Sequence, residues 1–241
     1  IHEAARLVRS SRPLFLRVPR APEVSDHDFE RLKQQKLALL CRRSLPLPVG
    51  RGMLTIGTLN TIPIEPLQMP KICLAGRIPP QNAILALEDN RCTSKHKMWP
   101  DFHNGVAAGL RLPLAKEGGK RLTRTWIVCN RPKPPPPPPP AQASQLPPTP
   151  DPDHTYGGFL FALGLRGHLS ALDKTDIVDY INKGPVTTAV GMMLGLAANK
   201  RGSCDVTIFK TLCVHIPSLL PSSFRSIDLS SSVQTAAVAG V

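Results

Sequence analysis

The segment GGFLFALGLRGHLSAL (Gly157 to Leu172) is echoed by TTAVGMMLGLAANKRGS (Thr187 to Ser203), and glycines and alanines recur between the two at an offset of 31 residues. Glycine inside a helix costs about 1 kcal/mol relative to alanine, so its recurrence in helical segments needs a compensating gain. Close packing of helix backbones provides that gain. The sequence therefore predicts small-residue contacts between stacked helices, at Gly105, Gly109, Gly164, Gly167, Gly191, Gly195, Gly202 and Gly240.

A repeat of this length is typical of solenoids and rings, in which each unit of roughly 20 to 50 residues buries its apolar face against its neighbours. We therefore expect a mainly α fold, a partial α-toroid or solenoid of helical repeats, over residues 154–241. Between two of the helices, Gly184 is expected to form a left-handed C-cap and Pro185 to start the next helix at its first position. The predicted helices span 154–172, 175–182, 186–201, 205–215 and the residues from 231 onward.

Residues 1–44 form a separate helical segment in this interpretation. A short helix is predicted at residues 2–10, followed by an extended stretch that contains three prolines. Ser25 is a good N-cap, and the acidic residues after it match the positive end of a helix dipole. A second helix is therefore expected from Ser25 to about Ser44.

Residues 45–133 have an irregular pattern, in which short β-leaning runs alternate with prolines. The runs at 53–59 and 71–78 and the segment Thr125 to Asn130 are predicted to be strands of a small sheet. Within this region, residues 102–110 have the pattern of a first repeat helix.

Residues 134–153 are expected to be a disordered linker, because they begin with seven consecutive prolines and stay rich in Pro, Gln, Ser and Thr. Such a run adopts polyproline II and spans roughly 3.1 Å per residue. We interpret it as an exposed spacer, and a ligand for an SH3-type or profilin-type domain is the alternative. Thr149 precedes Pro150 and is a candidate phosphorylation site.

Five strings carry a resemblance to a known family, and they occur in the order in which that family has them. The sequence resembles the large-subunit family of the anaphase-promoting complex, or cyclosome, which contains proteasome/cyclosome repeats. We therefore expect the chain to be a fragment of such a subunit. The strings are FHNGVAAGL (102–110), GFLFALGLRGHLSAL (158–172), VGMMLGLAANKRG (190–202), VHIPSLLP (214–221) and VQTAAVAGV (233–241).

The resemblance implies a function without catalysis. Members of this family are scaffold subunits of a cullin-RING-type ubiquitin ligase that controls mitotic progression and exit. The implied partners are the cullin/RING module, the tetratricopeptide-repeat subunits and the coactivators, and the implied location is the nucleus and the cytoplasm. A non-ATPase scaffold subunit of the proteasome regulatory particle, which has similar repeats, is the alternative. The strings at 102–110 and 214–221 favour the first family.

Charge is distributed unevenly along the chain, whose formal net charge is +13. Residues 1–133 contain 23 basic residues (Lys and Arg) and 10 acidic residues (Asp and Glu), whereas residues 134–241 contain seven basic and seven acidic residues. Few aromatic residues accompany the basic ones, so we expect acidic protein partners and no nucleic-acid binding. No stretch is long and apolar enough for a membrane span, so no membrane partner is expected.

The residue types that carry chemistry are scattered. The six cysteines form no CxxC pair and no Cys/His cluster with zinc spacing, so we expect reduced thiols and no metal. A Cys129 nucleophile with His103 as its base lacks any orienting context. No paired carboxylates, triad or phosphate loop appears, and so we expect no cofactor and no enzyme activity.

Overall fold

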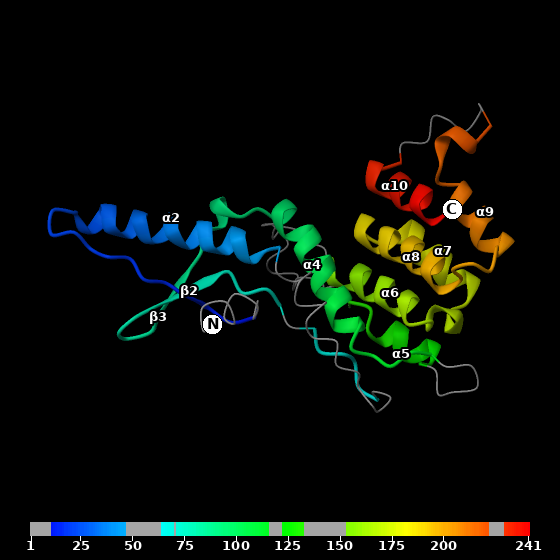
Figure 1. The fold of residues 1–241 in the computed structure, drawn as a ribbon, viewed down its shortest axis with the longest axis horizontal. Helices are drawn as coiled ribbons and strands as arrows, with labels where there is room; N and C mark the ends of the chain where they lie inside the picture. Colours follow the sequence, from blue (N-terminus) through cyan, green and yellow to red (C-terminus); the bar gives the residue numbers. More distant parts are fainter. Residues whose placement is uncertain (1–10, 47–63, 70, 116–121, 133–152, 222–228) are drawn as a thin grey trace, which may run out of the picture.

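The computed structural model describes residues 11–46, 64–69, 71–115, 122–132, 153–221 and 229–241. They form two groups of elements along the long axis of the molecule (Figure 1). One group, here called the N-terminal layer, is a helix on a small sheet. The other, here called the helix stack, contains α4, α6, α8 and α10, which are bounded below. The fold is mainly helical, as the sequence predicts.

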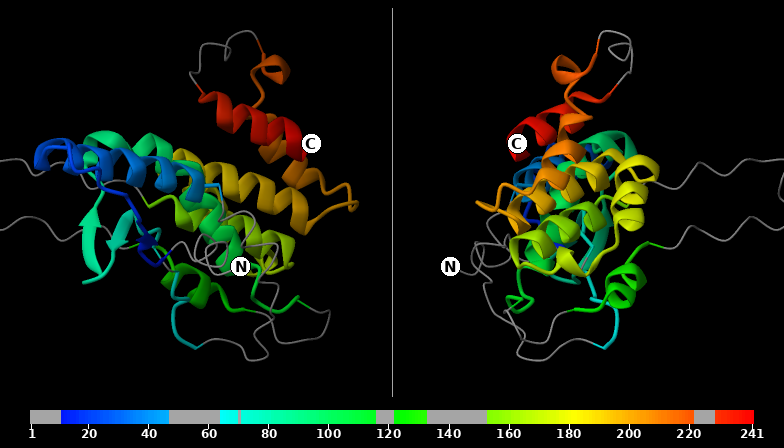
Figure 2. Two further views of the ribbon diagram at one scale, coloured as in Figure 1. Left: turned by 60° about the vertical axis from the view of Figure 1, so that its left-hand side comes forward. Right: turned by 90° about the vertical axis from the view of Figure 1, so that its right-hand side faces the viewer.

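The N-terminal layer contains β1 (Leu14–Phe15), α2 (Asp26–Ser44), β2 (Ala75–Ile78) and β3 (Ala83–Ala86). The strand order is β1-β2-β3, with β1 parallel to β2 and β2 antiparallel to β3. The hydroxyl of Ser25 caps α2 by accepting a 3.2 Å hydrogen bond from the Asp28 N–H, so the predicted helix start is confirmed. Helix α2 lies across one face of the sheet (Figures 1 and 2) and shares with it a small core, in which Leu14, Leu16, Leu37 and Cys41 are buried.

The helix stack begins with α4 (Ser94–Gly109), which starts eight residues before the predicted helix and runs through Pro100. Helix α6 (Thr155–Leu165) packs between α4 and α8 (Val186–Asn199), and α10 (Ser231–Gly240) packs on α8 (Figure 1). Because α6 and α8 are apolar around most of their circumference, both can be covered on several sides. Their residues provide most of the larger core, including Phe159, Leu160, Met192 and Met193.

Shorter elements surround the stack. Helix α7 (Lys174–Lys183) packs on α8, and α9 (Val206–Cys213) contacts α8 and α10. Both start where the sequence places acidic caps: Asp173 forms a capping box, and Asp205 accepts hydrogen bonds from two backbone N–H groups. The remaining elements of the described residues are α5 (Arg124–Cys129) and three 3-10 turns, η1 (Asp89–Arg91), η3 (Leu169–Ala171) and η4 (Pro217–Leu219).

The predicted strand at Thr125 to Asn130 is wrong, because this segment is the helix α5. The β-branched and aromatic residues of the segment suggested a strand, but the side chain of Thr123 caps a helix by accepting from the Trp126 N–H at 3.2 Å. Trp126 then packs against Phe159 of α6, with ring centroids 6.0 Å apart. Tertiary burial therefore overrides the local β propensity.

Three predicted details of helix ends also differ. The helix expected over 154–172 ends at Leu165, and η3 follows after Gly167, whose φ is +81°. Gly184 has φ −87° and ψ 169°, so it is extended and does not form a left-handed cap. Pro185 is the N-cap of α8, one position before the predicted one. The predictions for residues 2–10, for the run at 53–59, and for the proline run and Thr149 lie outside the described residues.

Candidate functional site

The contact between α6 and α8 is made by backbone atoms. A Cβ added to Gly164 would lie under 3.0 Å from the carbonyl oxygen, Cα and carbonyl carbon of Gly195. At the other end of the pair, a Cβ on Gly191 would come equally close to the carbonyl oxygen of Gly157. Backbone atoms cannot move aside as the end of a side chain can. Only glycine therefore allows the two helices to approach this closely.

The contact between α4 and α6 is built in the same way. A Cβ on Gly105 would lie under 3.0 Å from the carbonyl oxygen of Thr155, and a Cβ on Gly158 would meet that of Phe102. Gly109 faces Ala162, whose Cβ would be 2.6 Å from the added atom. Helix α6 is therefore held through glycine contacts on two sides.

The other predicted glycines differ in position. Gly240 lies near the side chains of Leu212 and Ala197, at 3.0 and 3.2 Å from an added Cβ, which is a looser contact than those between backbones. Gly167 and Gly202 have φ of +81° and +75° and lie in turns. The prediction that these two residues pack between helices is wrong. Glycine is needed at both positions because a positive φ is strained for other residues.

Two packing glycines, Gly157 and Gly158, were not predicted. They precede the part of α6 in which the repeat offset of 31 residues is visible. Gly157 precedes Gly164 by seven residues, two helical turns, and so shares its face toward α8. That spacing was a usable signal, whereas nothing in the sequence indicated that Gly158 would face α4.

Hydrogen bonds of the Tyr156 hydroxyl join α5, α6 and α7. The hydroxyl of Tyr156 is hydrogen-bonded to the Ile127 carbonyl oxygen at 3.1 Å and to the Tyr180 hydroxyl at 2.9 Å. Burial raises the pKa of both phenols, and their mutual hydrogen bond raises that of Tyr156 further. The pair therefore stays neutral and satisfies a polar group inside the core.

An ion pair between α5 and α7 lies beside this hydrogen-bond network. Arg124 of α5 donates two hydrogen bonds, of 2.6 and 2.7 Å, to the carboxylate of Asp176 on α7. The bond to Arg124 is the main cause of the lowered pKa of Asp176. The guanidinium of Arg131 lies over the Tyr180 ring, 5.4 Å from its centroid. These contacts fix α5 and α7 relative to the stack.

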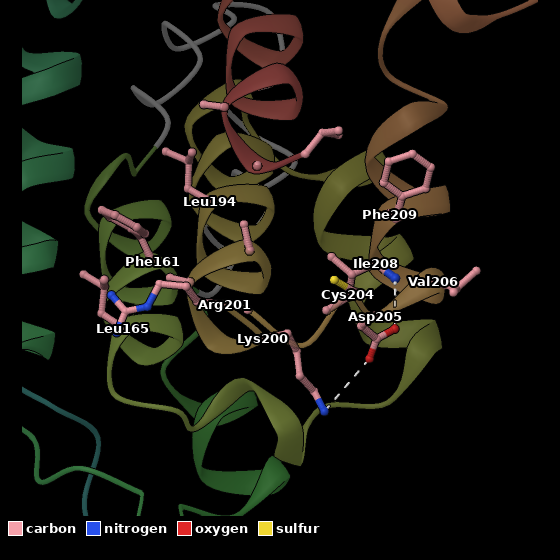
Figure 3. A pocket seen from close by; sticks show the side chains of 16 residues that line it. Phe161, Leu165, Leu194, Lys200, Arg201, Cys204, Asp205, Val206, Ile208 and Phe209 are labelled. Atoms are coloured by element: carbon pink, nitrogen blue, oxygen red, sulfur yellow. Dashed lines mark hydrogen bonds and ion pairs between the residues drawn. The ribbon is translucent and has the colours of Figure 1, made fainter.

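An apolar groove lies at the edge formed by α6, α8, α9 and α10, with a volume of about 840 Å³ (Figure 3). Phe161, Leu165, Ile208 and Phe209 contribute apolar side chains, and Leu165 and Phe209 are 42% and 50% exposed. The Nζ of Lys200 lies 4.0 Å from the Asp205 carboxylate at the rim. The groove therefore offers an apolar floor with a polar border.

The six cysteines and His103 were the candidates for catalysis or metal binding, and the structure shows their surroundings. All six cysteines are free thiols, and burial together with the nearby Cys92 and Cys73 raises the pKa of Cys41 to about 12. Cys129 is exposed, and burial lowers the pKa of His103. Within the described ranges, no group of three or more His, Cys, Asp or Glu residues is arranged to hold a metal ion. None of the described helices has the length and apolar character that crossing a bilayer requires.

The helix stack and its contacts define a helical-repeat protein whose neighbouring helices meet backbone to backbone. Sequence comparison agrees with that class and makes it specific. A family model described as APC1 fourth domain matches residues 1–201. The chain belongs to the anaphase-promoting complex subunit 1 family.

Relatives of the chain cover its whole length. The chain is 39% identical over 243 residues to a Homo sapiens protein named anaphase-promoting complex subunit 1, and 36% identical over 241 residues to the protein of that name from Dictyostelium discoideum. An Emericella nidulans protein named negative regulator of mitosis is 29% identical over 239 residues. The chain spans 12%, 10% and 11% of the lengths of these three relatives. This membership decides against the proteasome regulatory-particle alternative.

Proposed function

We propose that this chain is a rigid, non-catalytic scaffold segment of an anaphase-promoting complex subunit. The observation that carries the proposal is the continuous set of glycine-to-backbone contacts from α4 through α6 to α8. Close-packed backbones have few alternative arrangements, because displacement of one helix brings atoms of its neighbour into collision. A framework that holds other proteins at fixed positions needs such stiffness.

The partners proposed for the whole protein are the cullin/RING module, the tetratricopeptide-repeat subunits and the coactivators of a cullin-RING-type ubiquitin ligase. Family membership supports assembly with other subunits of the complex. We also propose a role in mitotic progression and exit, and the name of the Emericella relative supports the mitotic part of that role. We further propose that the protein occurs in the nucleus and the cytoplasm, which fluorescence imaging of the tagged endogenous protein through the cell cycle would test.

The apolar groove is the place where we expect a neighbouring repeat helix of the whole protein to pack. Its apolar floor is continuous with the stack, and α10 already rests on α8 beside it. Such packing would extend the stack by the same nearest-neighbour contacts that hold its present members.

The test compares Gly164→Ala with Gly240→Ala in the full-length subunit. The first adds a Cβ against the backbone of Gly195, and the second adds one against the flexible end of Leu212. We expect Gly164→Ala to reduce co-purification of the cullin/RING and tetratricopeptide-repeat subunits, and Gly240→Ala to preserve it. Mass spectrometry of the purified complexes measures the yields. Unchanged assembly of the Gly164 variant, with loss of ubiquitin transfer alone, would contradict a purely structural role.

A further inference from the structure

The sheet of the N-terminal layer has an open edge at β3. In the antiparallel pair, Leu74 lies opposite Leu87, and the Leu87 N–H donates to the Leu74 carbonyl at 3.1 Å. Opposite residues in such a ladder alternate between hydrogen-bonded pairs and pairs whose polar groups point outward. Ile84 and its partner Arg77 therefore form an outward-pointing pair.

Two other hydrogen bonds agree with this assignment. The carbonyl oxygen of Arg77 points away from β3 and accepts from the Leu16 N–H at 3.0 Å. On the other side of the hairpin, the carbonyl oxygen of Ala86 points away from β2 and accepts from the Gln34 side-chain amide, also at 3.0 Å. Ile84 therefore directs its N–H and C=O to the outer edge, where no described group pairs with them.

The side chain of Gln34 shows what this edge binds. Its amide nitrogen donates to the Ala86 carbonyl, and its amide oxygen accepts from the Glu88 N–H at 3.4 Å. These are the two bonds that the N–H and C=O of one residue in a further parallel strand would make. The Gln34 side chain of α2 therefore occupies the end of the edge near Ala86 and Glu88. The Ile84 end stays open, and Ile84 is 71% exposed.

One basic residue lies next to the open position. Arg77 is opposite Ile84 in the ladder and is the only charged residue in the three described strands, and its Nε is buried without a hydrogen-bond partner among the described residues. Glu88, the first of two acids that follow β3, is paired with Arg91 at 2.7 Å. An acidic segment is therefore the partner that complements Arg77.

We propose that the outer edge of β3 is a strand-addition site, at which an extended acidic segment of another polypeptide pairs with Ile84 and adds a fourth strand. Main-chain hydrogen bonds would hold the segment, and Arg77 would select its charge. The site lies outside the helix stack and goes beyond the proposed scaffold role, because it names a surface and the chemistry of its occupant.

Hydrogen exchange at single amides, in the full-length subunit free and within the purified complex, tests this directly. The Ile84 amide should exchange at least about tenfold more slowly in the complex, whereas the Leu85 amide, already paired with Gly76, should be protected in both. Equal exchange of the Ile84 amide in the two states would overturn the proposal. Failure of the subunit to assemble would instead count against the proposed function.

A pair of variants of opposite charge identifies the occupant. Ile84→Asp places a negative charge on the edge and should abolish the protection at position 84 in the complex, whereas Ile84→Lys, which attracts an acidic segment, should retain it. Protection of Leu85 in the free variants controls for an intact hairpin. Equal behaviour of the two variants would overturn an acidic partner. A photo-crosslinker at position 84 should capture an acidic segment of another subunit, and capture of a second copy of this chain would also overturn the proposal.

Discussion

The helix stack and the N-terminal layer are packed by different means. In the stack, α6 meets α4 and α8 through glycines that touch backbone atoms, so each contact depends on the absence of a side chain. In the N-terminal layer, α2 rests on the sheet through Leu37, whose side-chain end faces Gly76. A contact made by a flexible side chain can adjust, whereas one made by two backbones cannot. The same substitution should therefore have unequal effects in the two regions.

The largest effect is expected for Gly164→Ala and Gly191→Ala, which would break the backbone contact between α6 and α8. Each added Cβ would lie under 3.0 Å from backbone atoms of the opposite helix, so the helices must separate. We expect a loss of about 3 kcal/mol in the free energy of unfolding, at the upper end of the usual cost of overpacking. Chemical denaturation followed by circular dichroism measures it. Gly240→Ala is the matched control, and equal losses for all three variants would contradict this account.

The Tyr156→Phe substitution measures how much the hydrogen bonds of the Tyr156 hydroxyl contribute to the stability of the helix stack. The substitution keeps the ring but leaves the Ile127 carbonyl and the Tyr180 hydroxyl without their partner. An unsatisfied buried polar group costs about 1 to 3 kcal/mol, so we expect a loss of about 2 kcal/mol in unfolding free energy. The measurement is again denaturation, with Tyr180→Phe for comparison. A stability equal to that of the unmodified chain would mean that this network contributes nothing net.

Gly76→Ala sharpens the comparison in the N-terminal layer. Its Cβ would lie 3.0 Å from Leu37 Cδ1 and 3.4 Å from Leu16 Cβ, and the Leu37 side chain can rotate away. Because alanine also suits a strand better than glycine, we expect a change below about 1 kcal/mol. The ratio of this value to the Gly164→Ala loss measures how far the two regions differ. A Gly76→Ala loss as large as that at Gly164 would remove the distinction.

The smallest effect concerns pH. The folded-state pKa of Asp176 is lowered from 3.8, mainly by the hydrogen bond from Arg124, so the contact stabilises the fold above that pH. Its contribution is lost as the pH falls through the lower folded-state value. Arg124→Gln should therefore flatten the decrease in melting temperature between about pH 5 and pH 2.5. Thermal scans at several pH values measure it, and parallel profiles for the two proteins would show that the pair is inert.

The repeat pattern was sufficient to predict that the stack is helical, although not where α4 begins or where α6 ends, because small residues that recur at a fixed offset indicate close contacts between helices. Sequence spacing also singled out Gly164 and Gly195, which the structure places against each other. It failed at Gly167 and Gly202, because glycine is used both for close approach and for a positive φ, and spacing cannot separate the two uses.

Other features needed the tertiary structure. Helix α5 reads as a strand locally, and only its burial against α6 explains the outcome. The β3 edge likewise has no sequence signature, since the direction of the Ile84 N–H depends on its pairing with β2. Contacts set by register or by a neighbouring element are beyond the reach of a single sequence.

The adjacent glycines Gly157 and Gly158 make α6 sensitive to its own length. One faces α8 and the other α4, so their directions are separated by the rotation of a single residue, about 100°. Inserting one residue at the start of α6 would turn both glycines by that angle and present side chains to two neighbours at once. Changes of chain length should therefore be excluded from α6.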